Sequence, residues 1–312
     1  MPSPSLTDGV PGLEGIHTLT PPSPWPSVVL NAWEDPTTGL TQLPHTRLRD
    51  IQGLLDKADS DDPRMNLVNR MGETAFPRQQ RGKTLVYTGV VVGATLSEMR
   101  ALIAKLRAAT ETLSSSPDGW GAGLSAAYNP TYDPTGMVFS AYGMPIAFTC
   151  DETQGTGDQS PTPYQRDFVL SYRMADPRWW VTSPGPIVVG SPTPIADGVS
   201  AVLTMTGTAP TEPTFNILGS GSGSSTIQLY HTELNRTLEI DLPAALTSGE
   251  VMIVDFFNRT ITAGGNDVTG YIDWASTDWW GEAASGAPML VGANTLTVSG
   301  GSWSCAASPA CW

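Results

Sequence analysis

After about residue 183 the sequence becomes a succession of short apolar runs separated by turn residues, and this pattern constrains the fold more than any other feature. The runs recur at intervals of roughly 8–12 residues, as is typical of antiparallel sandwiches and jelly rolls. Breakers are frequent in the whole chain, which has 32 Gly and 27 Pro among 312 residues. We therefore expect a mainly β protein. The strands expected in this part are 199–206, 225–231, 236–242, 250–257, 269–274 and 295–303.

The first half combines β-rich runs with one strong helix signal. A dense run of β-branched residues predicts a strand at 85–93. Thr95 and Glu98 then form a capping box, which predicts a helix over 95–112. Its apolar residues share one helical face, so the helix should pack on a sheet; they are Leu96, Met99, Leu102, Ile103 and Leu106. Further strands are expected at 28–30, 137–139, 146–148 and 166–174.

Length and proline spacing predict two domains. A chain of 312 residues is long enough for two cores. A proline-rich stretch that contains Pro184, Pro186, Pro192 and Pro194 separates the mixed half from the purely β half. The predicted domains are therefore 1–182, β-rich with one packed helix, and 183–312, an antiparallel β-sandwich of galectin-like or jelly-roll-like type.

Two regions of the first half are expected to lie outside the core. Residues 1–27 are rich in proline and predict an extended arm that does not enter a central strand. Residues 45–82 are polar and predict a long loop or a pair of arms. Near the end of this region stands a basic cluster, which is either a solvated face or an electrostatic contact with an acidic neighbour; it consists of Arg78, Arg81 and Lys83.

The charge of the chain weighs against two kinds of partner. The net charge is −14 and the isoelectric point is about 4.4. Stable binding to nucleic acid depends on Lys and Arg contacts with phosphates, and anionic membranes attract basic surfaces. We therefore expect neither stable nucleic-acid binding nor membrane binding, although an acidic wall suits a channel through which DNA slides. The sequence shows no signal peptide or membrane span, and we expect synthesis in a cytosol with Cys150 as a lone thiol. Cys305 and Cys311 either close a small disulfide loop or, as we prefer for a cytosolic protein, are reduced thiols.

Residues suited to catalysis are sparse. The three histidines, His17, His45 and His231, have no partner at metal-ligand spacing. His17 and His45 are expected to face solvent, and His231 to end a strand. No nucleophile-elbow motif occurs. We expect no enzymatic activity, no cofactor and no metal.

One stretch could hide an activity. Asp273, Trp274, Asp278, Trp279 and Trp280 place two carboxylates among three indoles. Aromatic platforms with carboxylates are used by sugar-binding and sugar-cleaving sites. The alternatives are a Trp-rich core and edge, a carbohydrate-binding site of a receptor-recognition module, or a glycosidase in which Asp273 is essential. The first is preferred, and these five residues are the candidate glycan contacts.

The order of segments resembles the distal tail protein (Dit) family of long-tailed siphophages. The matching pieces are the strand and helix at 85–112, the segment from Phe168 to Trp180, the sequence GEVMIVD with the later NRTI at 249–261, and YIDWAS with its following Trp residues at 271–280. They span most of residues 85–303, and the first 80 or so residues do not take part.

The resemblance implies a structural virion protein of the tail tip, or baseplate. Its N-terminal belt domain would assemble with other copies into a ring, commonly a hexamer, and its C-terminal galectin-like sandwich would face outward. The ring would join the tail tube protein to the tail-associated hub protein, with other tail-tip or fibre proteins as further partners, and DNA would pass through its centre. The protein would be made and assembled in the host bacterial cytoplasm.

Overall fold

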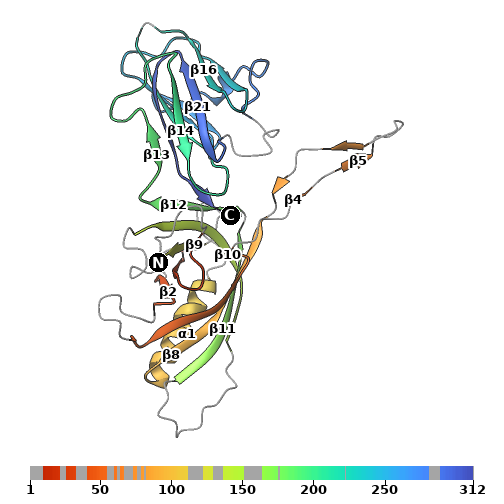
Figure 1. The fold of residues 1–312 in the computed structure, drawn as a ribbon, viewed down its shortest axis with the longest axis vertical. Coiled ribbons are helices and arrows are strands. Elements are labelled where there is room, and N and C mark those ends of the chain that lie inside the picture. The colour runs from red at the N-terminus through yellow and green to blue at the C-terminus, as the bar shows by residue number, and fades with distance from the viewer. Residues whose placement is uncertain are drawn as a thin grey trace. The chain divides into compact units, whose positions relative to one another are not determined.

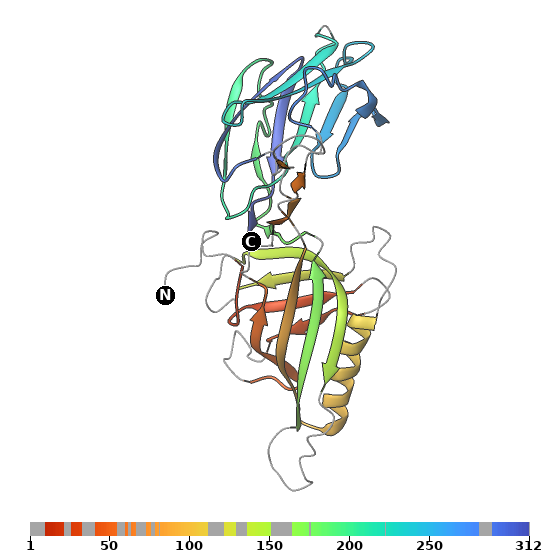
Figure 2. The ribbon, with the colours of Figure 1, turned by 90° about the vertical axis from the view of Figure 1, so that its right-hand side faces the viewer.

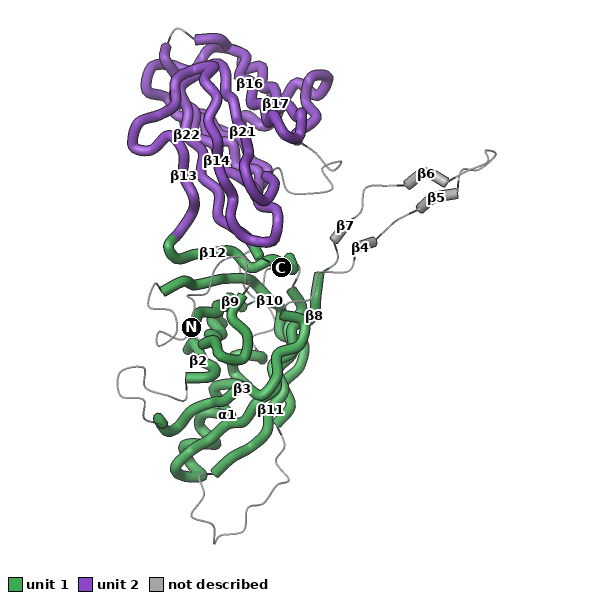
Figure 3. Tube along the Cα trace, viewed as in Figure 1, with its two compact units in different colours: residues 1–61, 80–184, 311–312 green, residues 62–79, 185–310 purple. Residues whose placement is uncertain are grey.

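The structure is a computed structural model of the chain, and it divides into two compact units. It describes residues 10–21, 26–32, 41–54, 60–61, 64–66, 73–75, 79–80, 82–111, 122–128, 136–150, 164–174, 176–221, 223–280 and 289–311. Unit 1 comprises Met1–Asp61, Gln80–Pro184 and Cys311–Trp312, and unit 2 comprises Asp62–Gln79 and Gly185–Ala310 (Figure 3). The chain thus leaves unit 1 after Pro184 and returns to it at Cys311, whose side chain is buried in the core of unit 1.

Unit 1 is built on one strongly curved antiparallel sheet (Figures 1 and 2). Its strands follow the order β2-β1-β9-β10-β11-β8-β3, with β12 beside β10 and β23 beside β12. The strands are β1 (Ile16–Thr20), β2 (Val28–Leu30), β3 (His45–Gln52), β8 (Lys83–Gly93), β9 (Ala122–Ala127), β10 (Val138–Cys150), β11 (Tyr164–Met174), β12 (Trp179–Ser183) and β23 (Ala310–Cys311).

The helix α1 (Leu96–Glu111) lies where the capping box predicts it. The amides of Ala94 and Thr95 donate to Oε2 of Glu98, and the Glu98 amide donates to Oγ1 of Thr95. Met99 and Leu106 are buried in the core of unit 1, and the helix packs against β8, β10 and β11 (Figure 2). The apolar face read from the sequence is therefore the face that packs on the sheet.

Strand β10 bends in its middle, which explains why the sequence predicts two short strands there. Its first part, up to Gly143, pairs with β9, and its second part, from Met144, pairs with β11. The register shifts between Pro145 and Ala147. A bulge of this kind turns the strand without ending it.

Two expectations for the first half of the chain are wrong. The segment Ile16–Thr20, placed in the extended arm, forms β1 in the interior of the sheet between β2 and β9. This is possible because the five residues contain no proline, so every amide can take part in pairing. His45–Gln52, expected in a loop, forms β3 along β8.

Short antiparallel pairs follow β3. They are β4 (Ser60–Asp61) with β7 (Gln79–Gln80), and β5 (Arg64–Asn66) with β6 (Glu73–Ala75). In chain order the pair β5 and β6 lies between β4 and β7, as in a hairpin inserted between β3 and β8. The expected pair of arms therefore contains strands. Arg78 and Arg81 lie outside the described residues. Lys83 is not on a solvated face: it is 7% exposed and its Nζ donates to the Leu54 carbonyl oxygen over 3.0 Å.

Unit 2 is an antiparallel sandwich of two sheets (Figure 1). Their orders are β13-β22-β15-β18-β19-β20 and β14-β21-β16-β17. The elements are β13 (Ile187–Val189), β14 (Ser200–Met205), β15 (Thr214–Leu218), β16 (Thr226–His231), β17 (Arg236–Asp241), β18 (Val251–Asp255), β19 (Thr260–Ala263), β20 (Asn266–Asp267), the short helix η2 (Thr269–Tyr271), β21 (Gly292–Ser299) and β22 (Ser302–Ala307).

Two expected strands of unit 2 differ from the observed ones. The segment 269–274 is not a strand but begins with η2. The run 295–303 is divided between β21 and β22, which belong to different sheets. Gly300 makes the turn between them with a φ of 100°, and a Cβ at this position would lie 2.8 Å from the Thr226 carbonyl oxygen. Only glycine adopts this φ without strain and also avoids the contact, because it has no Cβ.

Two further findings bear on the expected class of protein. No helix in the described ranges is long and apolar enough to cross a membrane. Cys150, Cys305 and Cys311 take part in no disulfide. Cys305 is buried in the core of unit 2 and Cys311 in that of unit 1, and burial raises the pKa of the Cys305 thiol above its ordinary value.

Candidate functional site

The aromatic and acidic stretch singled out in the sequence covers the edge strand β17. The amide of Asp273 donates to the Glu239 carbonyl oxygen over 3.0 Å, and the amides of Asp278 and Trp279 donate to that of Thr237 over 2.9 Å. In the opposite direction, the Thr237 amide donates to Oδ1 of Asp278 over 2.6 Å, and the Glu239 amide to Oγ1 of Thr277 over 3.0 Å. The side chains of Asp278 and Thr277 thus bind backbone amides of β17 that would otherwise be free to pair with another strand.

The structure separates the three candidate indoles. Trp279 and Trp280 are 3% and 9% exposed and belong to the core of unit 2. Both pack on Phe256, with ring centroids 4.8 Å and 5.0 Å away, and Trp279 also meets Phe215 edge-on. Neither ring offers a free face to a ligand. Trp274 is 61% exposed and remains the one indole of the three that can serve as a platform.

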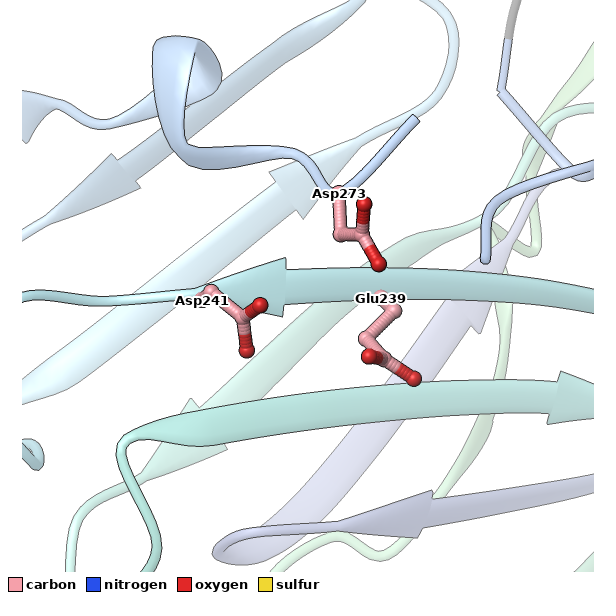
Figure 4. Close-up of side chains that lie close together, drawn as sticks. All are labelled: Glu239, Asp241 and Asp273. Atoms are coloured by element: carbon pink, nitrogen blue, oxygen red, sulfur yellow. The ribbon is translucent and has the colours of Figure 1, made fainter. Parts of the chain in front are cut away.

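Asp273, which precedes Trp274 in the sequence, belongs to a group of three carboxylates (Figure 4). One carboxylate oxygen from each of Glu239, Asp241 and Asp273 lies within 4.8 Å of the others. Glu239 and Asp241 come from β17 and Asp273 from the covering segment. Glu239 and Asp241 were not among the site residues predicted from the sequence. The alternation of Leu238 and Ile240 with polar residues would have placed both carboxylates on the outer face of the strand.

The local hydrogen bonds account for this arrangement. Gln228 donates to Glu239 over 3.0 Å and Thr226 to Asp241 over 2.7 Å. Asp273 accepts from the Ala275 amide over 3.0 Å, and hydrogen bonds from Ser276 and Ala275 lower its pKa below the ordinary value. A general acid of a glycosidase needs a raised pKa. Asp273 therefore suits an acceptor of hydrogen bonds better than a proton donor. Carboxylates also bind hard cations, but these hydrogen bonds explain the geometry without one.

Two of the three histidines are not placed as expected. His17 is fully buried, with Nε2 donating to the Gly12 carbonyl oxygen over 3.2 Å and Nδ1 accepting from the Tyr87 hydroxyl over 3.3 Å. His45 is 9% exposed, and its Nδ1 contacts the Gln42 carbonyl oxygen. Both were expected to face solvent, and both are instead buried, His17 on β1 and His45 at the start of β3. His231 ends β16, as expected, and is fully buried.

Unit 1 carries an apolar feature that the sequence analysis missed. Tyr142, Met144 and Ile146 of β10 are 52%, 47% and 56% exposed. They alternate with Ala141, Gly143 and Pro145, which are buried. The side chains therefore point away from the core, and we call them the β10 stripe. Exposed apolar side chains grouped in this way mark interaction surfaces.

Comparisons with known proteins agree with the resemblance read from the sequence. Residues 206–307 match the sequence model of a family described as siphovirus-type tail component, C-terminal domain. The fold of the chain is similar to the crystal structure of the SPP1 Dit protein, described as a paradigm of the hub adsorption apparatus in phages that infect Gram-positive bacteria. The TM-score is 0.57 at 11% identity, over 94% of this chain and 98% of that chain.

A second solved structure is more distant. It is the phage P2 baseplate in its activated conformation with calcium, matched with a TM-score of 0.40 at 8% identity over 95% of this chain and 97% of that chain. This similarity is too low to support a conclusion. A search of curated proteins finds no match.

Proposed function

We propose that this chain is a Dit-type structural protein of the tail tip, where its copies form a ring. The observation that carries the proposal is the combination of two independent similarities. The family match covers residues 206–307 of unit 2, and the similarity to the SPP1 Dit fold extends over 94% of the chain. The ring would connect the tail tube to a hub protein at the distal end of the tail, and it would have no catalytic step of its own.

The β10 stripe supports association with another copy. A ring with a single kind of contact needs two different surfaces on each subunit, one of which packs on the other in the next subunit. Tyr142, Met144 and Ile146 offer exposed apolar area on a strand in the interior of the sheet, where an isolated protein would gain nothing from them. We propose that the next copy of unit 1 covers this stripe.

The charge of the chain supports a channel for DNA. A net charge of −14 repels phosphates, so DNA would pass without being retained. The copy number, commonly six in the family, and the galectin-like character of unit 2 are parts of the same proposal.

Ring formation is tested on the purified full chain. Light scattering should give the mass of a closed oligomer, and negative-stain images should show rings with a central opening. A chain that remains monomeric at high concentration, alone and when mixed with its tail tube protein, would contradict the proposal.

The role of the β10 stripe is tested by a double substitution, Tyr142→Ser with Ile146→Ser. In the proposed contact both side chains would be buried by the next copy. Their loss should therefore weaken subunit association by at least about tenfold. Val202→Ser is the matched control, because Val202 is 53% exposed on β14 of unit 2. An unchanged dissociation concentration in the double variant would exclude this surface from the ring contact.

As a second candidate function, we propose carbohydrate binding in receptor recognition. The supporting observation is the exposed indole of Trp274 beside the carboxylate of Asp273, with Asp278 in the same segment. Trp274→Ala should then abolish binding to host wall polysaccharide while the ring still forms, and Val202→Ala should leave binding intact. Absence of any glycan binding by the intact chain would eliminate this candidate.

A further inference from the structure

A buried polar network in unit 2 fixes the tautomer of His231. Its Nε2 lies 2.9 Å from Oδ1 of Asn294, and both side chains are fully buried. The Asn294 amide nitrogen donates to the carbonyl oxygens of Leu203, Leu290 and Gly292, and its Oδ1 also accepts from the Leu290 amide. Since Asn294 Oδ1 is an acceptor, Nε2 of His231 must carry a hydrogen.

The other ring nitrogen faces two groups of opposite character. The amide of Leu234 donates to Nδ1 over 3.3 Å, and Oε2 of Glu233 lies 3.4 Å from the same atom. A neutral ring protonated on Nε2 presents a lone pair at Nδ1. That lone pair can accept from Leu234, but it cannot bond to a carboxylate.

Proton uptake reverses this preference. A protonated imidazole has a hydrogen on both nitrogens. Nδ1 then repels the Leu234 amide and can donate to Glu233. The Glu233 carboxylate is already held in place, because it accepts from the amide and the hydroxyl of Thr295 over 2.7 Å and 2.6 Å. The second partner is therefore positioned before the proton arrives.

We propose that the turn at residues 232–235 is an acid-sensitive switch, in which Nδ1 of His231 exchanges the Leu234 amide for the Glu233 carboxylate when the ring gains a proton. The proposal does not depend on ring assembly. In the acidic state His231 and Glu233 would form an ion pair in addition to the hydrogen bonds that hold Glu233 on Thr295 of β21, and the Leu234 amide would be released to solvent.

The groups around His231 determine the pH at which the exchange occurs. Among its contacts from the turn, from β21 and from the segment before 281, Glu233 supplies the charge, whereas Asn294 and the edge-on ring of Trp279 are uncharged. On β17 the cross-strand partner of His231 is Arg236, whose guanidinium contacts Asp278. Burial lowers the pKa of His231, and Asn294 and Glu233 oppose this effect. Although partial burial disfavours its ionisation, hydrogen bonds from Thr295 keep the pKa of Glu233 below the ordinary value, so it stays charged while the histidine titrates.

The full chain is suited to a direct test by NMR, because it has three histidines. Protein labelled with 15N in His and Leu is titrated from neutral to acidic pH, with assignments from single His→Gln variants. The His231 ring and the Leu234 amide should titrate together, with a midpoint below the ordinary value of about 6.5. If the ring titrates and the Leu234 amide does not follow, or if the ring stays neutral until the protein unfolds, the proposal is overturned.

A conservative variant tests the second partner. Glu233→Gln keeps an oxygen for Thr295 but removes the charge, and it should lower the His231 midpoint by roughly half a pH unit. Glu239→Gln, which removes a carboxylate from the outer face of the neighbouring strand β17, should leave the midpoint unchanged. A midpoint that is the same in Glu233→Gln and in the unmodified chain would show that Glu233 does not receive the proton.

Discussion

Asn31 and Thr46 join the two edges of the curved sheet in unit 1. The Asn31 amide donates to Oγ1 of Thr46 over 3.2 Å, and that hydroxyl donates to the Val29 carbonyl oxygen over 3.2 Å. The Leu48 amide donates to Oδ1 of Asn31 over 3.2 Å. Side-chain hydrogen bonds thus link β2 and β3, the two end strands of the order β2-β1-β9-β10-β11-β8-β3.

Asn31→Ala should destabilise unit 1 by about 3 kcal/mol. Besides the Leu48 contact, the side-chain Nδ2 of Asn31 donates to the carbonyl oxygens of Leu13 and Gly15. These oxygens would be left unpaired in the variant. The backbone φ of 66° adds strain for alanine. Urea unfolding measures the change, and Asn31→Gly separates the two effects because glycine tolerates this φ. A loss below about 0.5 kcal/mol in Asn31→Ala would mean that these hydrogen bonds do not hold the edges.

Trp279→Ala and Trp274→Ala should differ sharply in stability. The first removes a core indole and should cost about 3–5 kcal/mol. The second changes an exposed side chain and should alter the free energy of unfolding by less than about 0.5 kcal/mol. Denaturant unfolding of unit 2, followed by near-UV circular dichroism, checks both. Equal effects would contradict the assignment of Trp279 to the core.

His17 should make unit 1 sensitive to acid. Burial lowers the pKa of His17 from 6.5 to about 4. The folded state therefore binds a proton more weakly than the unfolded state, so its stability is full above pH 6.5 and falls as the pH drops toward about 4. The loss should reach about 3 kcal/mol. The measurement is the urea midpoint as a function of pH, and His17→Gln should flatten the curve over this window. A curve of unchanged slope in the variant would assign the acid sensitivity to other groups.

Glu98→Ala should weaken the start of α1. Its carboxylate accepts from the amides of Ala94 and Thr95, so the substitution should cost about 1 kcal/mol. Amide hydrogen exchange in the first turn of the helix should rise in the same variant. Ser97→Ala, at an exposed position of the same turn, is the control and should change little. Equal exchange rates in the two variants would contradict the cap.

The cysteines should differ in reactivity. Burial raises the pKa of the Cys305 thiol, and only a thiolate reacts rapidly with iodoacetamide. Cys311 is also fully buried, whereas Cys150 is partly exposed. Mass spectrometry of briefly labelled native protein should find the label on Cys150, with Cys305 and Cys311 modified after unfolding. Early labelling of Cys305 would indicate that the core of unit 2 opens easily.

Local sequence patterns were sufficient to predict some of the helices and strands. The capping box and the apolar face predict α1 correctly, dense β-branched residues predict β8, and the alternation of Phe168, Leu170 and Tyr172 with their neighbours predicts β11. The two glycines at 300–301 were a usable sign of the turn between β21 and β22. Strand β1 was missed because the prolines around it dominated the local composition.

By itself, the sequence determined a mainly β chain with one packed helix, and an order of segments that resembles the Dit family. These features depend on residue spacing along the chain, which is local. The tertiary structure alone decided that Trp279 is core and Trp274 is surface, that His17 is buried, and that Glu239, Asp241 and Asp273 meet. Those properties depend on which distant strands become neighbours and which face of a segment they cover. A one-residue change in the register of β1, for example, would turn His17 to the opposite face of the sheet.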